Sequence, residues 1–215
     1  TLAAEMGDRV AIATADVGIE EEVNAAVAAL ESQLGPCDLM LANAGIGDAR
    51  SSRRFSAAAT KKVLNVNVEG VIHALAAVIP GMVERGHGTV AATSSVAGYR
   101  AMPNFGPYCA SKAYVSSLME ATRVDLRTSG IKVSTIHPGF VVSELTDKNT
   151  FYMPFLVKTE RAARIIVDGL ERGKSEINFP WRMVVLLKLV RLVPNWIFDR
   201  CVTAMSPIQP KRELQ

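Results

Sequence analysis

The stretch Thr89-Val90-Ala91-Ala92-Thr93-Ser94-Ser95 sets the fold class of this 215-residue chain. Its first five residues form a short apolar run with no alternation of polar and apolar positions, which is typical of a strand buried on both faces. Two serines follow directly, so hydroxyl groups stand where the strand ends. We therefore interpret this stretch as a buried parallel strand whose carboxyl end carries polar side chains.

Similar apolar runs recur on both sides of this strand, and longer amphipathic stretches separate them. We expect strands at 10–14, 39–42, 89–93, 131–136 and 177–179, and helices at 20–34, 61–84, 108–129 and 159–173. This alternation predicts an α/β fold, a doubly wound parallel sheet of the Rossmann-like type. Ligands gather beyond the carboxyl ends of such strands, which directs attention to Asp16, Asn43, Ser95 and Pro138.

Composition and charge exclude several function classes. The balance of 49% hydrophobic and 21% charged residues is that of an ordinary globular protein. A formal net charge of +3, with no basic run beside aromatic residues, predicts no nucleic-acid partner. The cysteines Cys37, Cys109 and Cys201 are far apart and lack a histidine cluster, so we expect neither a metal site nor a disulfide framework. Free cysteines and a start unlike a signal peptide predict a cytoplasmic location.

A phenol and an ammonium lie four residues apart in Tyr108-Cys109-Ala110-Ser111-Lys112. On a helix, residues at this spacing share one face. A nearby positive charge would lower the pKa of the tyrosine from its usual value of about 10. The pair could then act as a general acid or base near neutral pH, although this spacing alone occurs on many surface helices.

Six short motifs occur together in this chain, in an order and at a spacing that point to one known family. They are Asp16-Val17, Asn43-Ala44-Gly45, Asn67-Val68-Glu69-Gly70, Thr93-Ser94-Ser95-Val96-Ala97-Gly98, Tyr108 to Lys112, and Pro138-Gly139-Phe140-Val141. With these motifs the chain resembles the short-chain dehydrogenase/reductase family from residue 1 to about 180. Ser95 stands 13 residues before Tyr108, an offset that favours it over Ser94 as the active-site serine.

The resemblance implies an NAD- or NADP-dependent oxidoreductase that interconverts an alcohol and a carbonyl by hydride transfer. Tyr108 would give or take the proton of the substrate oxygen, and Ser95 would hydrogen-bond that oxygen. Lys112 would lower the pKa of Tyr108 and bind the nicotinamide ribose, and Asn67 would hold a water in a proton relay with Lys112. The further cofactor contacts implied are Asp16, Val17, Asn43, Ala44, Gly45, Pro138, Gly139, Val141 and Ser143, the last standing where the family commonly has threonine.

Several of these residues also have simpler explanations. Asp16 suits a turn or a helix cap, and Gly45 suits a turn. Asn67 is an ordinary polar residue of a helix when taken alone, although asparagine is a poor helix former. We assign His137 to a structural role and Cys109 to packing, because Tyr108 already fills the acid/base role.

The family's Gly-rich turn of the type Thr-Gly-x-x-x-Gly-x-Gly, which lies between its first strand and helix, has no counterpart in these 215 residues. That turn holds the cofactor pyrophosphate at a helix N-terminus. We therefore expect the chain as written to bind a dinucleotide weakly or not at all, with little activity of its own. A non-catalytic binding or scaffold protein that lost the phosphate loop is the alternative function.

The same comparison with the family predicts a gap in the sheet. Strands 1 and 2 of the family order 3-2-1-4-5-6-7 have no counterpart here, and in that order they separate the 10–14 run from the 39–42 run. We expect the 10–14 strand either to pair directly with 39–42 or to be poorly held.

Residues 181–215 follow the 1–180 domain as an apolar extension, in which Arg182, Lys188 and Arg191 interrupt the apolar run from Trp181 to Val193. Two interpretations stay open. The helix could lie on a membrane surface or cover a lipid-like substrate pocket, or it could pack on the core or on a second subunit. Such apolar surface favours an apolar alcohol or carbonyl substrate and association, and the resemblance implies a homodimer or homotetramer.

Overall fold

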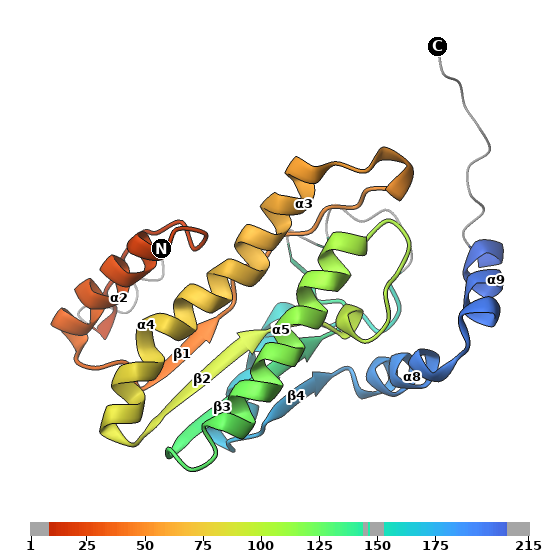
Figure 1. Cartoon of the computed structure of the whole chain (residues 1–215). Helices are drawn as coiled ribbons and strands as arrows, with labels where there is room; N and C mark the ends of the chain where they lie inside the picture. Colours follow the sequence, from red (N-terminus) through yellow and green to blue (C-terminus); the bar gives the residue numbers. More distant parts are fainter. Residues whose placement is uncertain (1–8, 144–145, 147–152, 206–215) are drawn as a thin grey trace.

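A four-stranded parallel sheet lies at the centre of the computed structural model, which describes residues 9–143, 146 and 153–205 (Figure 1). Its strands are β1 (Leu39–Ala42), β2 (Gly88–Thr93), β3 (Ile131–Pro138) and β4 (Glu176–Phe179), in that spatial order. Each neighbouring pair is parallel, so all four carboxyl ends lie at one edge. The predicted α/β fold with a parallel sheet is confirmed.

Helices cover both faces of the sheet because alternate strand side chains point to opposite sides. Val90 and Ala92 of β2 pack with α4 (Gly70–Arg85) and α5 (Gly106–Asp125), which lie next to each other over one face (Figure 1). Ala91, between them in the sequence, packs with α7 (Thr159–Glu171) on the other face. α2 (Glu20–Leu34) packs against α4 on the β1 side of the molecule (Figure 1).

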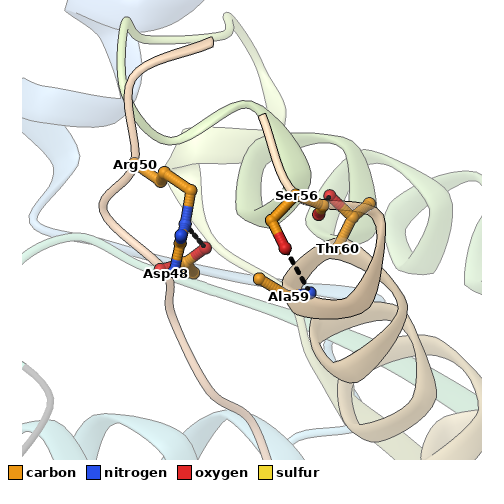
Figure 2. Close-up of polar contacts among 5 residues, drawn as sticks. All are labelled: Asp48, Arg50, Ser56, Ala59 and Thr60. Carbon is orange, nitrogen blue, oxygen red and sulfur yellow. Dashed lines mark hydrogen bonds and ion pairs between the residues drawn. The ribbon is translucent and has the colours of Figure 1, made fainter. Parts of the chain in front are cut away.

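The loop between β1 and α3 (Ala57–Leu64) includes the short helical turn η2 (Ser52–Arg54). An ion pair of 3.0 Å joins Asp48 to Arg50 in this loop (Figure 2). Ser56 then begins the helix four residues earlier than the expected residue 61. Its hydroxyl accepts a hydrogen bond from the Ala59 N–H at 3.3 Å, which satisfies a donor of the first helical turn (Figure 2).

One long helical run leads from α3 to α4 through a π-helical segment, η3 (Asn65–Glu69). By length and composition this run, Ala57–Arg85, is apolar enough to cross a membrane. Here Val71, Leu75 and Met82 are buried in the core beside β2, so the run serves as a core helix of this domain. The π-helical segment shifts the helix register at Asn67, which is completely buried.

The predicted strand at 10–14 is wrong. These residues form no strand, and Ile12 exposes 71% of its surface. A strand satisfies its backbone hydrogen-bonding groups through a neighbour, and the described residues offer the 10–14 segment no ladder with β1. Of the two expected outcomes, the structure therefore shows a first segment that the sheet does not hold.

The chain ends, within its described part, in α8 (Trp181–Leu192) and α9 (Asn195–Met205) beyond β4, on the opposite side from α2 (Figure 1). α8 packs through Met183 and Val184 onto Val96, in the helical turn η4 (Val96–Gly98) that follows β2. Arg100 holds α9, because its guanidinium donates to the Asn195 side chain at 3.0 Å and lies 4.2 Å from the centre of the Phe198 ring.

Candidate active site

Three consecutive residues at the end of β2 make hydrogen bonds to helix α5 and to the end of β3. The Thr93 carbonyl accepts a hydrogen bond of 2.8 Å from the Lys112 ammonium, and the Ser94 hydroxyl donates to the Lys112 carbonyl at 2.7 Å. The Ser95 hydroxyl accepts from the Ala97 N–H at 3.1 Å and donates to the Pro138 carbonyl at 3.3 Å. The end of β2 thereby joins α5 to the end of β3.

Tyr108 and Lys112 share one face of α5, as the four-residue spacing predicts, and the Lys112 nitrogen lies 5.8 Å from the centre of the Tyr108 ring. Burial raises the pKa of Tyr108 above its usual value, while a side-chain hydrogen bond with Ser95 lowers it in part. The expected net lowering of the Tyr108 pKa is therefore wrong for this chain, because loss of solvation is the largest effect. The neutral phenol is the form that this environment favours.

Lys112 is a buried ammonium, with 3% of its surface exposed. Burial lowers the pKa of Lys112 to about 8, since a charged ammonium loses its hydration there. Within the described residues its nitrogen donates one hydrogen bond, to Thr93, and has no carboxylate partner. An ammonium carries three donors, so Lys112 keeps hydrogen-bonding capacity for a bound molecule.

Asn67 joins the loop after β1 to helix α5, next to Lys112. Its Oδ1 accepts from the Ile46 N–H at 2.8 Å, and its Nδ2 donates to the Ile46 carbonyl at 2.9 Å and to the Ser111 hydroxyl at 3.0 Å. A Cβ added to Gly45 would lie 3.3 Å from the Lys112 nitrogen and 3.4 Å from Asn67 Oδ1. Glycine at position 45 therefore lets the backbone of this loop approach both side chains.

The first two residues of this loop complete the arrangement. The Thr93 hydroxyl donates to Asn43 Oδ1 at 2.8 Å, across the ends of β1 and β2. Asn43, Ala44 and Gly45 are exposed, so a ligand can reach them from solvent. The structure thus brings together six of the predicted site residues at the carboxyl ends of the strands: Asn43, Gly45, Asn67, Ser95, Tyr108 and Lys112.

The predicted adenine contacts Asp16 and Val17 lie in a turn before α2. The Asp16 carboxylate accepts from the Gly18 N–H at 2.9 Å, which is the turn-capping role that the sequence left open. The Val17 carbonyl lies 2.9 Å from His73 Nδ1. The Val17 side chain packs so closely on Gly70 that a Cβ added there would lie 2.8 Å from it. The turn is therefore attached to α4 rather than to the loop of Asn43.

The remaining predicted cofactor contacts follow β3. Pro138 is joined to the site through its hydrogen bond from Ser95. A Cβ on Gly139 would come within 2.7 Å of the Met183 sulfur, so glycine here allows α8 to pack closely. Val141 forms an isolated parallel bridge with Val157, and the Ser143 N–H donates to the Thr146 hydroxyl at 2.9 Å. The printed contacts of these two residues are thus with Val157 and Thr146, in the segment that follows β3.

A buried polar chain behind Lys112 escaped the sequence reasoning. The Ser116 hydroxyl forms hydrogen bonds with the Ser94 hydroxyl at 2.8 Å and with His137 Nε2 at 3.1 Å. It also donates to the Lys112 carbonyl at 3.0 Å. The His137 ring stacks on Tyr99 with centroids 5.1 Å apart, and burial lowers the pKa of His137. The position of Ser116, one helical turn after Lys112, was the signal available in the sequence.

Lys112 makes the free energy of unfolding depend on pH. Its folded pKa of about 8 lies below the unfolded value of 10.5, so above pH 8 the unfolded chain binds more protons and stability rises with pH. We expect a gain of about 2 kcal/mol between pH 8 and pH 10 in the wild type relative to Lys112→Met. Above pH 10 the raised pKa values of Tyr99 and Tyr108 act in the opposite direction.

Urea unfolding of both proteins at intervals between pH 7 and pH 10 measures this difference. The exposed Lys61 gives a matched control, since Lys61→Met removes the same charge from the surface of α3. A constant difference between wild type and Lys112→Met over the whole range would contradict the assignment.

This chain is similar in sequence to known proteins. The family model described as short chain dehydrogenase matches residues 1–151. An uncharacterized oxidoreductase of Myxococcus xanthus is 42% identical over 173 residues, which cover 80% of this chain and 68% of that protein.

Solved structures share the fold as well. A 3-ketoacyl-(acyl-carrier-protein) reductase from Brucella melitensis, complexed with NADH, is 27% identical with a TM-score of 0.73, over 78% of this chain and 74% of that one. A gluconate 5-dehydrogenase from Burkholderia cenocepacia, in complex with NADP and tartrate, is 30% identical with a TM-score of 0.61, over 64% of this chain and 55% of that one. The matched family model and the 42% identical relative lead to one conclusion: the chain belongs to the short-chain dehydrogenase family.

Proposed function

We propose that this chain forms the catalytic part of a nicotinamide-dependent oxidoreductase that interconverts an alcohol and a carbonyl. The observation that carries the proposal is the meeting of a neutral phenol, a hydroxyl and a buried ammonium at the carboxyl ends of parallel strands, in Tyr108, Ser95 and Lys112. The NADH and NADP complexes of the two similar structures support the choice of cofactor.

Tyr108 is proposed as the acid and base. In reduction its phenol gives a proton to the carbonyl oxygen, and in oxidation its phenolate takes the proton of the alcohol. The Ser95 hydroxyl, which already faces Tyr108, donates a hydrogen bond to the same oxygen. The bound nicotinamide supplies or accepts the hydride at the carbon, so the two electrons and the proton are accounted for.

The residues present fit the nicotinamide ribose of such a cofactor. Lys112 has donors to spare beyond its bond to Thr93, and ribose hydroxyls accept such bonds. The exposed loop of Asn43, Ala44 and Gly45 lies beside this ammonium with no side chain at position 45. Pro138, Gly139, Val141 and Ser143 are proposed to line the nicotinamide side, and Asp16 and Val17 the adenine side.

Asn67 is proposed to act by position and by holding a water. Two of its three hydrogen bonds fix the backbone of Ile46, next to Gly45. Its Oδ1 retains a second lone pair, which can accept from a water that passes protons toward Lys112.

The surroundings support an apolar substrate and a dimer. Val96, which follows Ser95 in the sequence, packs with Tyr99, Phe140 and Met183, so an apolar cluster lies close to the site. An open apolar groove of about 300 Å³ runs between α4 and α5, lined by Ile72, Leu75, Ile79, Pro80, Leu118 and Thr122. We propose that two copies pair along this groove as a homodimer or within a homotetramer.

Titration with NADH and NADPH tests the proposal, using the protein expressed from its complete reading frame. Gly45→Val should weaken binding about tenfold or more, because the added carbons compete for the space beside Lys112 and Asn67. Gly106→Ala is the control, since a Cβ there meets no neighbour within 4 Å. Absence of binding by the unaltered protein would favour the non-catalytic scaffold instead.

A further inference from the structure

Helix α8 turns an apolar face to solvent. Trp181, Val185, Leu186, Leu189 and Leu192 all lie on it, and their exposed fractions run from 49% for Val185 to 79% for Leu192. Their spacing of four, five, eight and eleven residues from Trp181 places them on one side of a helix. A contiguous exposed patch of this kind marks a contact surface, because single exposed residues are common and clustered ones are not.

The opposite face of α8 is anchored to the domain. Met183 and Val184 are buried against Val96, and the Lys188 ammonium lies 3.5 Å from the Glu176 carboxylate of β4. The apolar face therefore stays exposed to solvent although α8 is packed on the core of the domain. We name this surface the α8 face, defined by Trp181, Val185, Leu186, Leu189 and Leu192.

Both tryptophans of the chain lie in its last two described helices. Trp181 begins α8 and Trp196 lies in the first turn of α9, and each exposes 68% of its surface. Tryptophan prefers the boundary between hydrocarbon and water, since its ring is apolar and its N–H needs a polar partner. The two exposed indoles therefore suit a bilayer interface.

The charged residues of α8 are all positive, and the helical spacing places Arg182 within the α8 face. α8 carries Arg182, Lys188 and Arg191 and no acidic residue. The Arg182 guanidinium lies 5.5 Å from the centre of the Trp181 ring, so a cation stands at the edge of the apolar surface. Long cationic side chains can lay their carbons on apolar surface and reach lipid phosphates with their charged ends.

We propose that the α8 face docks on an anionic phospholipid surface. A second copy of this chain is the other candidate occupant, but a two-fold contact through the α8 face would bury Arg182 of both copies, and α8 has no acidic residue to pair with either. An anionic bilayer satisfies both the apolar patch and the cations. The proposal does not rest on the proposed catalytic activity.

Intrinsic tryptophan fluorescence reports on this surface, because Trp181 of the α8 face is one of the two tryptophans of the chain. We expect vesicles that mix phosphatidylcholine with phosphatidylglycerol to shift the emission to shorter wavelength and to sediment the protein. Vesicles of phosphatidylcholine alone should bind it more weakly. Equal partitioning into both vesicle types overturns the assignment of an anionic surface.

Surface substitutions separate the apolar and the charged contributions. Leu189→Gln and Leu192→Gln should each lower the vesicle partition coefficient about tenfold, and Val167→Gln on α7, also half exposed, should leave it unchanged. Arg182→Ala should lower it about fivefold for the mixed vesicles, with the exposed Lys61→Ala and Lys62→Ala as charge-matched controls. Circular dichroism checks that each variant is folded.

Sedimentation equilibrium without lipid tests the competing occupant. The Leu189→Gln and Leu192→Gln variants should keep the oligomeric state of the wild type if the α8 face binds lipid. A wild type that ignores both vesicle types and whose dimer dissociates in these variants would overturn the proposal and assign the face to a second copy.

Discussion

Replacing Tyr108 by phenylalanine is expected to remove nearly all turnover, by about 10³-fold or more in kcat/KM. The substitution deletes one hydroxyl and keeps the ring, so the packing of α5 should be unchanged. Phenylalanine can neither give nor take the proton of the substrate oxygen. The reaction would then depend on proton exchange with solvent at a partly buried site.

The measurement compares both directions of the reaction in the protein from the complete reading frame, over a set of small alcohols and carbonyls. Tyr114→Phe on the same helix is the matched control, since Tyr114 is 45% exposed and lies outside the site. Binding of the dinucleotide and the melting temperature should stay at wild-type values in both variants. A Tyr108→Phe protein with more than a tenth of wild-type turnover would sink the assignment of the acid.

The raised pKa of Tyr108 adds a direction to this result. Because burial favours the neutral phenol, reduction has its acid in place at neutral pH, whereas oxidation needs the phenolate. We expect the oxidation rate of the wild type to rise with pH toward the pKa of Tyr108, and this rise to disappear in Tyr108→Phe.

Replacing Asn67 by alanine is expected to have the largest effect on stability, a loss of about 2–4 kcal/mol in the free energy of unfolding. Asn67 is completely buried, and its loss would leave the Ile46 N–H and carbonyl without their partners. Ser111 would lose a hydrogen bond as well. Each polar group that stays buried without a partner costs free energy that water supplied in the unfolded chain.

Urea unfolding measures this loss, and Asn24→Ala provides the control on the exposed surface of α2. The control should change stability by no more than about 0.5 kcal/mol. Dinucleotide binding should weaken in Asn67→Ala under conditions where the protein is still folded, because the loop of Gly45 is no longer held. Equal stabilities of the two variants would show that Asn67 does not fix this loop.

Several elements could be predicted from the sequence because their signals are local. The helix Glu20–Leu34 and the strand Leu39–Ala42 begin and end at the predicted residues, since Gly35-Pro36 breaks the chain between them. Helical spacing predicted the Tyr108–Lys112 pair, and short motifs predicted its neighbours: Asn43 and Ser95 after strands, and Asn67 in a helix. The start of α3 was misplaced because the hydroxyl of Ser56, a cap rather than an apolar position, decides where that helix begins.

Other features depend on partners that are distant in the sequence. The 10–14 run has the composition of a strand, but composition cannot show whether a neighbouring strand is present to pair with it. The π-helical segment at Asn67 forms where that amide meets Ile46, 21 residues away. The chain from Ser94 through Ser116 to His137 joins three elements that only packing brings together.

The sequence by itself determined the parallel α/β fold, the family and the residue types at the site, because periodicity and motif spacing act along the chain. Only the tertiary structure decided the direction of the pKa shifts in the site and which side of α8 is exposed. The pKa shifts of Tyr108 and Lys112 follow from how much water the folded chain removes around them, because burial is the largest cause of each shift. Likewise, only packing shows which side of the largely apolar helix α8 is left in solvent.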